Sequence, residues 1–366
     1  MGDALSRLLN VAPEELVATR HRAVHTFLTS RGLGAAALAE LMRERVGAGE
    51  LLLTSSPVQG LANATSDLDF IRIQQDSIDG PRISTKIFEQ GHHLEVVSFS
   101  ATELERNLDE LAVLASRPPA AVVAGFRGWD KRFEPRRKQT ERIVNGITLD
   151  GTAPYLEHLP ALALVWSRAA LQNAVEQTVH LCLAEAAGEL RGRVGYAYNV
   201  LLHLMDAVLS LHGEVYTTRK WYLLRWTRFT PGDGWHDDAY RSAARTLERL
   251  RIGLRAAVAA GAELRLAEDY VALTTEVAAV TGAAGRITVQ PQLPVDAHVH
   301  SFLPGAGVLV CGDTALPVPD GTVLPTGEIS LTDLTTIDQA TASILLRALR
   351  AGIATVAVAY HEGDNR

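Results

Sequence analysis

Cysteine and lysine are both scarce in this 366-residue chain. Its two cysteines, Cys182 and Cys311, lie far apart, which excludes a disulfide scaffold and the paired spacing of a zinc site. We therefore expect a protein of the reducing cytoplasm. Four lysines stand against 31 arginines, a bias typical of a GC-rich genome that makes each lysine more noticeable.

The chain also lacks an excess of positive charge and long apolar runs. Its formal net charge is -7, whereas proteins that bind bulk nucleic acid usually carry a basic footprint. No unbroken apolar run approaches the roughly 18 residues that a membrane span needs. The composition therefore favours a soluble globular protein without a membrane or bulk nucleic acid as its partner.

Apolar periodicity predicts the α+β class, with strands and helices in separate parts of the chain. Helices are expected over 14–46, and short strands at 51–56, 66–74 and 92–100. Thr102 is the expected N-cap of the next helix, with Glu105 completing a capping box. The first 118 residues thus indicate a small mixed-sheet domain.

Helical periodicity dominates from about residue 120 to 285, which predicts a helical bundle over 119–285. Its clearest stretches are 161–187, 189–212, 237–260 and 264–281. The remaining segment, 286–366, is rich in Pro, Gly and Val and predicts a small α/β module with a late helix and a final strand. A winged-helix-like module is one interpretation of it, and a docking or homodimer surface is the default role.

The stretch "LLLTSSPVQGLANATSDLDFIRIQ", from Leu51 to Gln74, places two acids one residue apart in an apolar setting. In a strand, Asp67 and Asp69 would project from one face about 7 Å apart, and their charges would repel. A divalent cation commonly offsets such repulsion, because carboxylate oxygens suit Mg²⁺. Glu95, in the later apolar run "HHLEVVSF", is the expected third carboxylate. Turn or surface positions for these acids are the alternative.

This pattern resembles the signature of the DNA polymerase β-like nucleotidyltransferase superfamily. An apolar strand ends at Ser55 and Ser56, ten residues follow, and Asp67-x-Asp69 opens a second strand. The resemblance covers residues 48–100, and it departs from the family at Ser55, where a glycine is usual. It implies that Ser55 and Ser56 contact the triphosphate, and the serine in place of glycine would loosen the approach of the backbone.

The resemblance further implies two Mg²⁺ ions and a nucleoside triphosphate as co-substrate. Asp67 and Asp69 would bridge both ions, and Glu95 would join one of them and help to deprotonate the attacking hydroxyl. A nucleoside monophosphate would pass to a small hydroxylated molecule, and pyrophosphate would leave. The genome bias and the extra C-terminal segment suggest specialised metabolism or antibiotic modification.

Later residues resemble aminoglycoside-type members with a helical second domain. Lys220 and Trp221 follow a long helix that ends at Gly213, so Lys220 would bind the triphosphate; an ordinary solvated lysine is an equal alternative. The preceding helix carries the three residues that could line the acceptor cleft, with bundle packing as the alternative: Tyr198, Asn199 and Asp206.

Three further alternatives stay open. The basic run "RGWDKRFEPRRKQTER" is either a solvated helical face or an electropositive wall facing a phosphorylated ligand. The acceptor could be a protein or a tRNA end, although the acidic charge disfavours tRNA. The chain could also be a catalytically silent binding or scaffold protein that kept the fold, which Ser55 in place of glycine favours.

Overall fold

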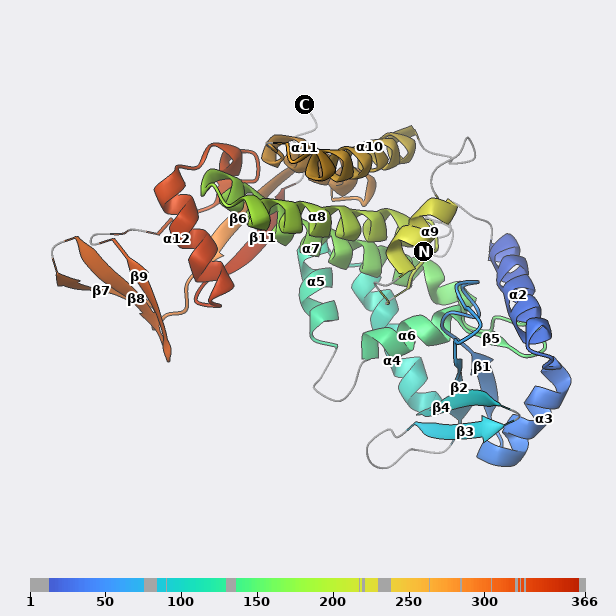
Figure 1. The fold of residues 1–366 in the computed structure, drawn as a ribbon. Coiled ribbons are helices and arrows are strands. Elements are labelled where there is room, and N and C mark those ends of the chain that lie inside the picture. The colour runs from blue at the N-terminus through green and yellow to red at the C-terminus, as the bar shows by residue number, and fades with distance from the viewer. Residues whose placement is uncertain are drawn as a thin grey trace. The chain divides into compact units, whose positions relative to one another are not determined.

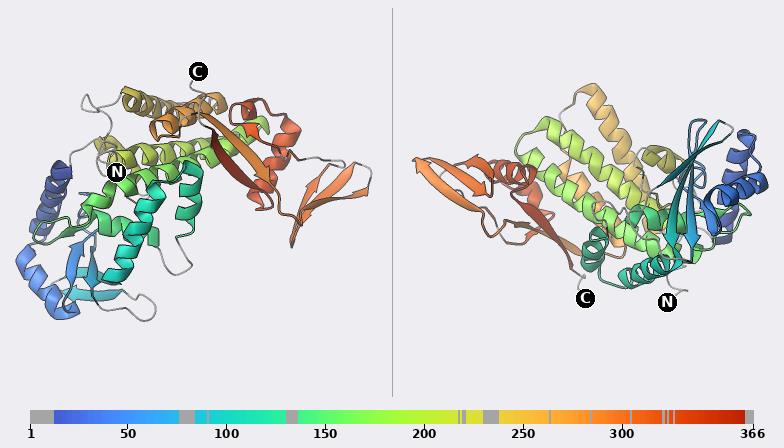
Figure 2. Two further views of the ribbon diagram at one scale, coloured as in Figure 1. Left: turned by 180° about the vertical axis from the view of Figure 1, so that it is seen from behind. Right: turned by 90° about the horizontal axis from the view of Figure 1, so that it is seen from below.

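The computed structural model divides into two compact units. Unit 1 comprises Met1–Ser167 and Leu209–Phe229, and unit 2 comprises Arg168–Val208 and Thr230–Arg366. Each unit contains helices and strands, which confirms the predicted α+β class (Figures 1 and 2). The structure describes residues 13–75, 84–89, 91–129, 136–216, 218, 221–229, 238–262, 264–283, 285–303, 305–319, 322, 324–325 and 327–361.

Unit 1 is built on a five-stranded mixed sheet. In sheet order its strands are β3 (Thr85–Glu89), β4 (His92–Ser100), β2 (Leu68–Gln74), β1 (Glu50–Leu53) and β5 (Ile147–Thr148). β2 and β4 run parallel, and the other neighbouring pairs are antiparallel. Its helices are α2 (Pro13–Ser30), α3 (Ala35–Val46), α4 (Ala101–Ala115), α5 (Pro119–Arg127), α6 (Arg136–Asn145) and α9 (Tyr222–Phe229), with the 3-10 turn η1 (Leu156–His158).

Helices α2 and α3 cover one face of this sheet. Leu68 and Phe70 of β2 pack there with Phe27 of α2 in a buried apolar cluster that also takes residues from β1, β4 and α3. Because side chains alternate along a strand, Asp69 and Glu95 point to the opposite face. That arrangement separates the apolar core behind the sheet from the acidic face in front of it.

Helices α4 and α6 approach the acidic face. Ile73 of β2 lines a cavity together with Leu104 and Leu108 of α4. A guanidinium of α6, that of Arg142, reaches the Asp69 carboxylate. The residues on this face of the sheet are therefore placed between two helices of the same unit.

The start of α4 lies earlier than the sequence suggested. Ser100, the last residue of β4, caps the helix, and its Oγ accepts a hydrogen bond from the Glu103 N–H at 3.2 Å. The predicted capping pair, Thr102 and Glu105, was wrong by two residues. No loop separates β4 from α4, so the last strand residue also serves as the N-cap.

Two long helices belong partly to each unit. They are α7 (Leu159–Ala186) and α8 (Leu190–Leu211), and the division falls after Ser167 in the first and after Val208 in the second. α8 is apolar and long enough to cross a membrane by length and composition alone. Two thirds of its most apolar window is buried in the protein, as in the core helix of a soluble protein.

Unit 2 contains two separate antiparallel sheets. The first has the order β10-β6-β11, with β6 (Arg286–Gln292), β10 (Ile329–Ser330) and β11 (Thr355–His361). The second is a meander of β7 (His298–Leu303), β8 (Ala306–Cys311) and β9 (Thr314–Val318). Its other elements are α10 (Asp238–Ala260), α11 (Ala267–Val280), α12 (Gln339–Arg350) and the 3-10 turn η3 (Asp333–Thr336).

Side-chain hydrogen bonds tie these elements to the part of α7 in unit 2. The hydroxyls of Thr178 and Thr274 lie 3.0 Å apart and join α7 to α11. Tyr360 of β11 donates to Gln172 Oε1 of α7 at 3.0 Å. The two compact units differ from the three predicted segments, whose boundaries, like the winged-helix-like interpretation of 286–366, stay predictions.

Candidate functional site

The chain leaves β1 through a buried turn at Thr54 and Ser55. The Thr54 N–H donates to the Asp69 carbonyl at 2.9 Å, so the pairing of β1 with β2 continues for one more residue. Ser55 then adopts φ = 65°, alone among the non-glycine residues that the structure describes. A side chain in this left-handed region costs about 1–2 kcal/mol. The backbone thus has a glycine-like conformation where the resemblance leads one to expect glycine.

The side chain of Ser55 is buried without a partner. Only 5% of the residue is exposed, and its Oγ has no hydrogen-bond partner among the described residues. Leaving a buried hydroxyl unpaired costs about 1–3 kcal/mol. The neighbouring Ser56 carbonyl, in contrast, accepts hydrogen bonds from the Leu61 and Ala62 N–H groups at 2.8 and 3.1 Å. The turn therefore offers a polar atom that a ligand oxygen could satisfy.

The predicted carboxylates lie on two adjacent parallel strands. Asp69 of β2 is the paired residue of Glu95 of β4, so their side chains project from the same face. Asp67 precedes β2 by one residue, and its carboxylate lies 3.1 Å from Nδ1 of His93, which precedes Glu95 by two residues. The fold therefore gathers all three acids at one end of the acidic face.

Cationic groups of the protein accompany these acids. Arg142 of α6 lies 3.4 Å from the Asp69 carboxylate, and both side chains are about one fifth exposed, at 21% and 20%. Glu95 is also paired with Lys86 of β3, the strand that borders β4 on the edge away from β2. Each acid thus has a cationic or ionisable group beside it.

Lys138, one turn before Arg142 on α6, belongs to the same charged region. Partial burial and the neighbouring Arg142 lower the pKa of its ammonium, while Asp69, Glu141 and Glu95 act in the opposite direction. The residue is nevertheless exposed to solvent. An accessible ammonium whose surroundings penalise its charge is well suited to accept an anionic ligand.

The carboxylates are not gathered into a metal centre in this conformation. Among the described residues, no three His, Cys, Asp or Glu side chains are placed to hold one ion. Asp67 is turned toward His93 and Asp69 toward Arg142. The donor set itself, three carboxylates on one sheet face, has the hard-oxygen chemistry of a Mg²⁺ site.

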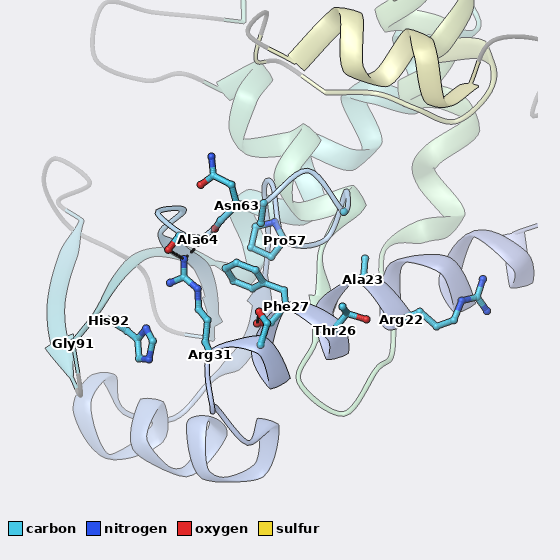
Figure 3. A pocket seen from close by; sticks show the side chains of 13 residues that line it. Arg22, Ala23, Thr26, Phe27, Arg31, Pro57, Asn63, Ala64, Gly91 and His92 are labelled. Carbon is cyan, nitrogen blue, oxygen red and sulfur yellow. Dashed lines mark hydrogen bonds between the residues drawn. The ribbon is translucent and has the colours of Figure 1, made fainter.

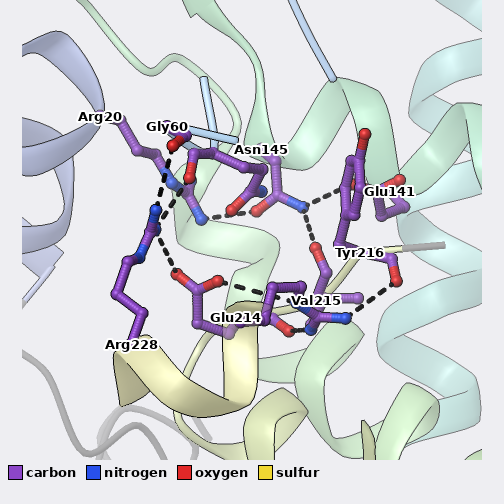
Figure 4. Close-up of polar contacts among 10 residues, drawn as sticks. Arg20, Gly60, Glu141, Asn145, Glu214, Val215, Tyr216 and Arg228 are labelled. Carbon is purple, nitrogen blue, oxygen red and sulfur yellow. Dashed lines mark hydrogen bonds and ion pairs between the residues drawn. The ribbon is translucent and has the colours of Figure 1, made fainter. Parts of the chain in front are cut away.

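A buried ionic cluster lies behind the turn that carries Ser55. Glu214, 3% exposed, is its central acid, with Arg225 Nε at 3.9 Å and Arg228 Nη2 at 4.0 Å (Figure 4). Arg228 also donates to the carbonyls of Gln59 and Gly60 at 2.8 and 3.3 Å. The cluster therefore anchors α9 to the loop that follows Ser55.

The cluster extends through Arg20 of α2 to α6. Arg20 donates to Asn145 Oδ1 at 2.6 Å, and Asn145 donates to Glu141 Oε1 at 3.0 Å (Figure 4). Burial lowers the pKa of Arg20 to about 10, against the raising effect of Glu214 and Glu141. Burial also raises the pKa of the Glu214 carboxyl, and this effect outweighs the attraction of its three arginines.

A family model matches almost the whole chain. The model, described as "Family of unknown function (DUF6001)", covers residues 11–360. This chain belongs to that family. The match spans both compact units, so the acidic face of the sheet and helices α7 and α8 all lie within the region that the family model covers. No curated protein matches the chain in sequence.

One solved structure resembles this DUF6001 chain weakly. It is a nucleotidyltransferase-like protein from Exiguobacterium sibiricum 255-15, with 12% identity and a TM-score of 0.25. The alignment covers 70% of this chain and 77% of that one. A superposition of this quality carries no argument about fold or function.

The structure places the predicted acceptor residues in unit 2, separately from the carboxylates. Tyr198 is 43% exposed, Asp206 is 4% exposed, and Asn199 donates to Gln177 Oε1 at 3.2 Å. Their role in acceptor binding stays a prediction. Lys220, the predicted triphosphate lysine, lies outside the described residues.

Several residues of the site were not identified from the sequence. Lys138 and Arg142 lie within the basic run "RGWDKRFEPRRKQTER", for which an electropositive wall was one interpretation. That run was the sequence signal that could have identified them. Arg228 and Arg20 gave none, because nothing in a lone arginine predicts a buried partner far along the chain. Their roles follow only from the tertiary contacts.

Proposed function

We propose that this protein transfers a nucleoside monophosphate from a nucleoside triphosphate to a hydroxyl group of a small molecule, with release of pyrophosphate. The observation that carries the proposal is the parallel pairing of Asp69 with Glu95, with Asp67 at the same end of the sheet. In the same unit, the strained turn at Ser55 begins the loop that leads to Asp67. The turn that would bind phosphate and the first two carboxylates thus lie at the two ends of one short segment, and strand pairing brings Glu95 beside Asp69.

The three acids, Asp67, Asp69 and Glu95, are the residues that would hold Mg²⁺. Bound there, Mg²⁺ supplies charge stabilisation for the entering and leaving oxygens at the α-phosphorus. Asp67 and Asp69 must first exchange their contacts with His93 and Arg142. Ion pairs between partly exposed side chains are worth about 1 kcal/mol or less, so the exchange is a small cost.

The chain's own groups divide the remaining work. Glu95 accepts the proton of the acceptor hydroxyl, whose oxygen forms a bond to the α-phosphorus as the bond to pyrophosphate breaks. Lys138 and Arg142, released from the carboxylates, bind phosphate oxygens as charge-assisted donors. Ser55 Oγ gains the partner that it lacks in the free protein. Lys220 is a further candidate for the triphosphate, and Tyr198, Asn199 and Asp206 for the acceptor.

A silent, nucleotide-free binding protein is the second candidate function. The observation that favours it is the set of cations beside the acids, since Arg142 and His93 already contact two of the carboxylates. Ser55 in a left-handed conformation is consistent with it as well, because a glycine would allow closer approach of a phosphate.

Two measurements separate these functions. The first is the thermal shift of the purified chain with each of the four triphosphates, with and without Mg²⁺. The second is pyrophosphate release with a library of hydroxylated small molecules, with tRNA and protein acceptors as further arms. Mg²⁺-dependent stabilisation by a triphosphate and pyrophosphate release that Asp69→Asn abolishes would support transfer. Absence of both responses for every triphosphate would overturn it in favour of the silent protein.

A further inference from the structure

A cavity of about 800 Å³ lies on the side of the sheet that α2 covers, behind the candidate carboxylates. One wall is the face of α2 that carries Ala23, Thr26 and Phe27, and the other is the loop 57–64 (Figure 3). His92, at the start of β4, closes one end. The small side chains along both walls leave the space between them open.

The charge of this α2 cavity is of one sign. Arg22, Arg31 and His92 line it, and none of the described lining residues is acidic. No described acid forms an ion pair with any of the three. Within the described part of the chain, the side-chain hydrogen bond of Arg22 goes to the Thr19 hydroxyl at 3.0 Å. In a chain with a net charge of -7, a cavity lined by two arginines and no described acid is a local inversion of the molecule's charge. Such a concave region concentrates anions from solution.

Arg31 is held in place for binding. Its Nη2 donates to the carbonyls of Asn63 and Ala64 at 3.2 and 2.9 Å, and its guanidinium lies 4.5 Å from the Phe27 ring centroid (Figure 3). Both carbonyls are neutral, so the positive charge is not compensated. Nε and Nη1 keep their N–H groups for another acceptor. A preorganised guanidinium loses little entropy when it binds a carboxylate or a phosphate.

We propose that the α2 cavity binds a small organic anion, in which a phosphate or carboxylate is attached to an apolar ring. The anionic group would pair with Arg31, with the Thr26 hydroxyl as a further donor. The Arg22 guanidinium, which donates to Thr19 one turn toward the start of α2, would add positive charge at the far end of the cavity. The apolar part would lie against Phe27 and Pro57, which line the same space. The volume is within the roughly 300–1,000 Å³ of small-molecule sites. This site stands independently of the proposed transfer reaction.

The position of the cavity gives such a ligand a route to the candidate site. The loop 57–64, its second wall, begins after Ser56 and ends shortly before Asp67. A ligand that contacts this loop would act on the segment that joins the turn at Ser55 to the Asp67 carboxylate.

Isothermal calorimetry with phenyl phosphate as the probe tests the proposal on the full chain. Phenol and inorganic phosphate are the matched controls, since each keeps one half of the probe. Arg31→Gln and Arg22→Gln are the cavity variants, and Arg43→Gln, an exposed arginine of α3, is the control variant. Circular dichroism checks that each variant is folded. Because both cavity arginines are on the surface of α2 or its end, at least one variant will retain the fold.

The expected result is saturable binding of phenyl phosphate that weakens about tenfold in a folded cavity variant, as loss of a charge-assisted contact predicts. Arg43→Gln should bind like the wild type, and added salt should weaken binding. Phenol binding as tightly as phenyl phosphate would overturn the anion site. So would absence of saturable binding to the wild type, or an equal loss in Arg43→Gln.

Discussion

Asp69 and Glu95 are paired residues on two parallel strands that are separated in sequence by an edge strand. Parallel pairing puts equivalent side chains on one face, so the register itself brings two acids together without help from a loop. Such a pair is stable only when cations are near, and Arg142 of α6 provides one in the free protein.

Asp67→Asn and Asp69→Asn should each abolish pyrophosphate release while the fold survives. Each amide removes a carboxylate from the face, and the ion pair lost with Arg142 or His93 is partly exposed and worth about 1 kcal/mol or less. Turnover and the urea midpoint would be measured together, with Asp109→Asn on the exposed side of α4 as the control. Activity within tenfold of the wild type in both variants would sink the assignment.

Glu95→Gln should reduce the rate of chemistry more than nucleotide affinity. General-base assistance is typically worth about 10²–10⁴-fold, whereas Asp67 and Asp69 remain available to the metal that accompanies the triphosphate. The check is single-turnover rate at saturation beside nucleotide affinity by calorimetry with Mg²⁺. A collapse of affinity with an unchanged single-turnover rate would make Glu95 a binding residue and move the third carboxylate elsewhere; Glu89 does not qualify, because it lies on the other face of the sheet beside Arg45 of α3.

Lys138→Ala and Lys220→Ala compare the two lysine candidates for the triphosphate. A lysine–phosphate contact is charge-assisted and worth roughly 1.5–3 kcal/mol, or about ten- to a hundredfold in affinity. The variant that loses nucleotide affinity, with acceptor affinity retained, identifies the lysine that contacts phosphate. Lys86→Ala serves as a third arm, because Lys86 neighbours Glu95 on the edge strand. Unchanged affinity in both main variants would leave Arg142 as the principal cation.

Ser55→Gly should stabilise the free protein, whereas Ser55→Ala should leave the strain of the left-handed backbone unchanged. Glycine removes the left-handed strain of about 1–2 kcal/mol, offset in part by its own unfolded-state entropy of about 0.5–1 kcal/mol. Both variants also remove the buried unpaired hydroxyl. Urea unfolding gives the comparison, and Ser55→Gly at or below the stability of Ser55→Ala would contradict the strain. If Oγ binds phosphate, both variants should also lose nucleotide affinity.

Stability should fall as pH rises through the titration of Glu214. Burial raises the pKa of this carboxyl in the folded state, so the folded protein holds a proton that the unfolded chain has released. The stability present below the ordinary glutamate pKa is therefore lost as pH increases toward the raised value, by about 1.4 kcal/mol for each pKa unit. Glu214→Gln should not show this loss. Urea midpoints between pH 5 and 8 would measure the difference, and the opposite slope would show that the arginines outweigh burial.

Local patterns in the sequence were sufficient for most elements of the fold. β4 was predicted with its observed bounds because its alternation is regular and Ser100 ends it. The long helices were predicted within a few residues because their apolar surfaces are extensive. β3 was missed: it is an edge strand whose Phe88 is exposed, so its side chains do not separate into a buried and a solvent face. β5 has only two residues, too few for a pattern.

The sequence suggested site residues only where they share a short segment or, like Glu95, stand in an apolar strand pattern. Ser55, Asp67 and Asp69 lie in one segment, and their spacing gave the hypothesis. Arg142 lies 73 residues from Asp69, and Arg20 lies 125 residues from Asn145, so no spacing rule could pair them. The left-handed backbone at Ser55 was likewise invisible, since serine rarely adopts it.

The ionic cluster around Glu214 has a consequence for how the chain can be cut and how it folds. Arg20 belongs to the first segment of unit 1, whereas Glu214, Arg225 and Arg228 belong to its second segment, beyond part of α7 and most of α8. A fragment that stops at Ser167 would lack Glu214, the central acid of the cluster around Arg20. Glu141 would remain near Arg20, whereas Glu214 and its two arginines would be missing. We therefore expect residues 1–167 alone to be less stable than the whole of unit 1, although they contain every strand of its sheet.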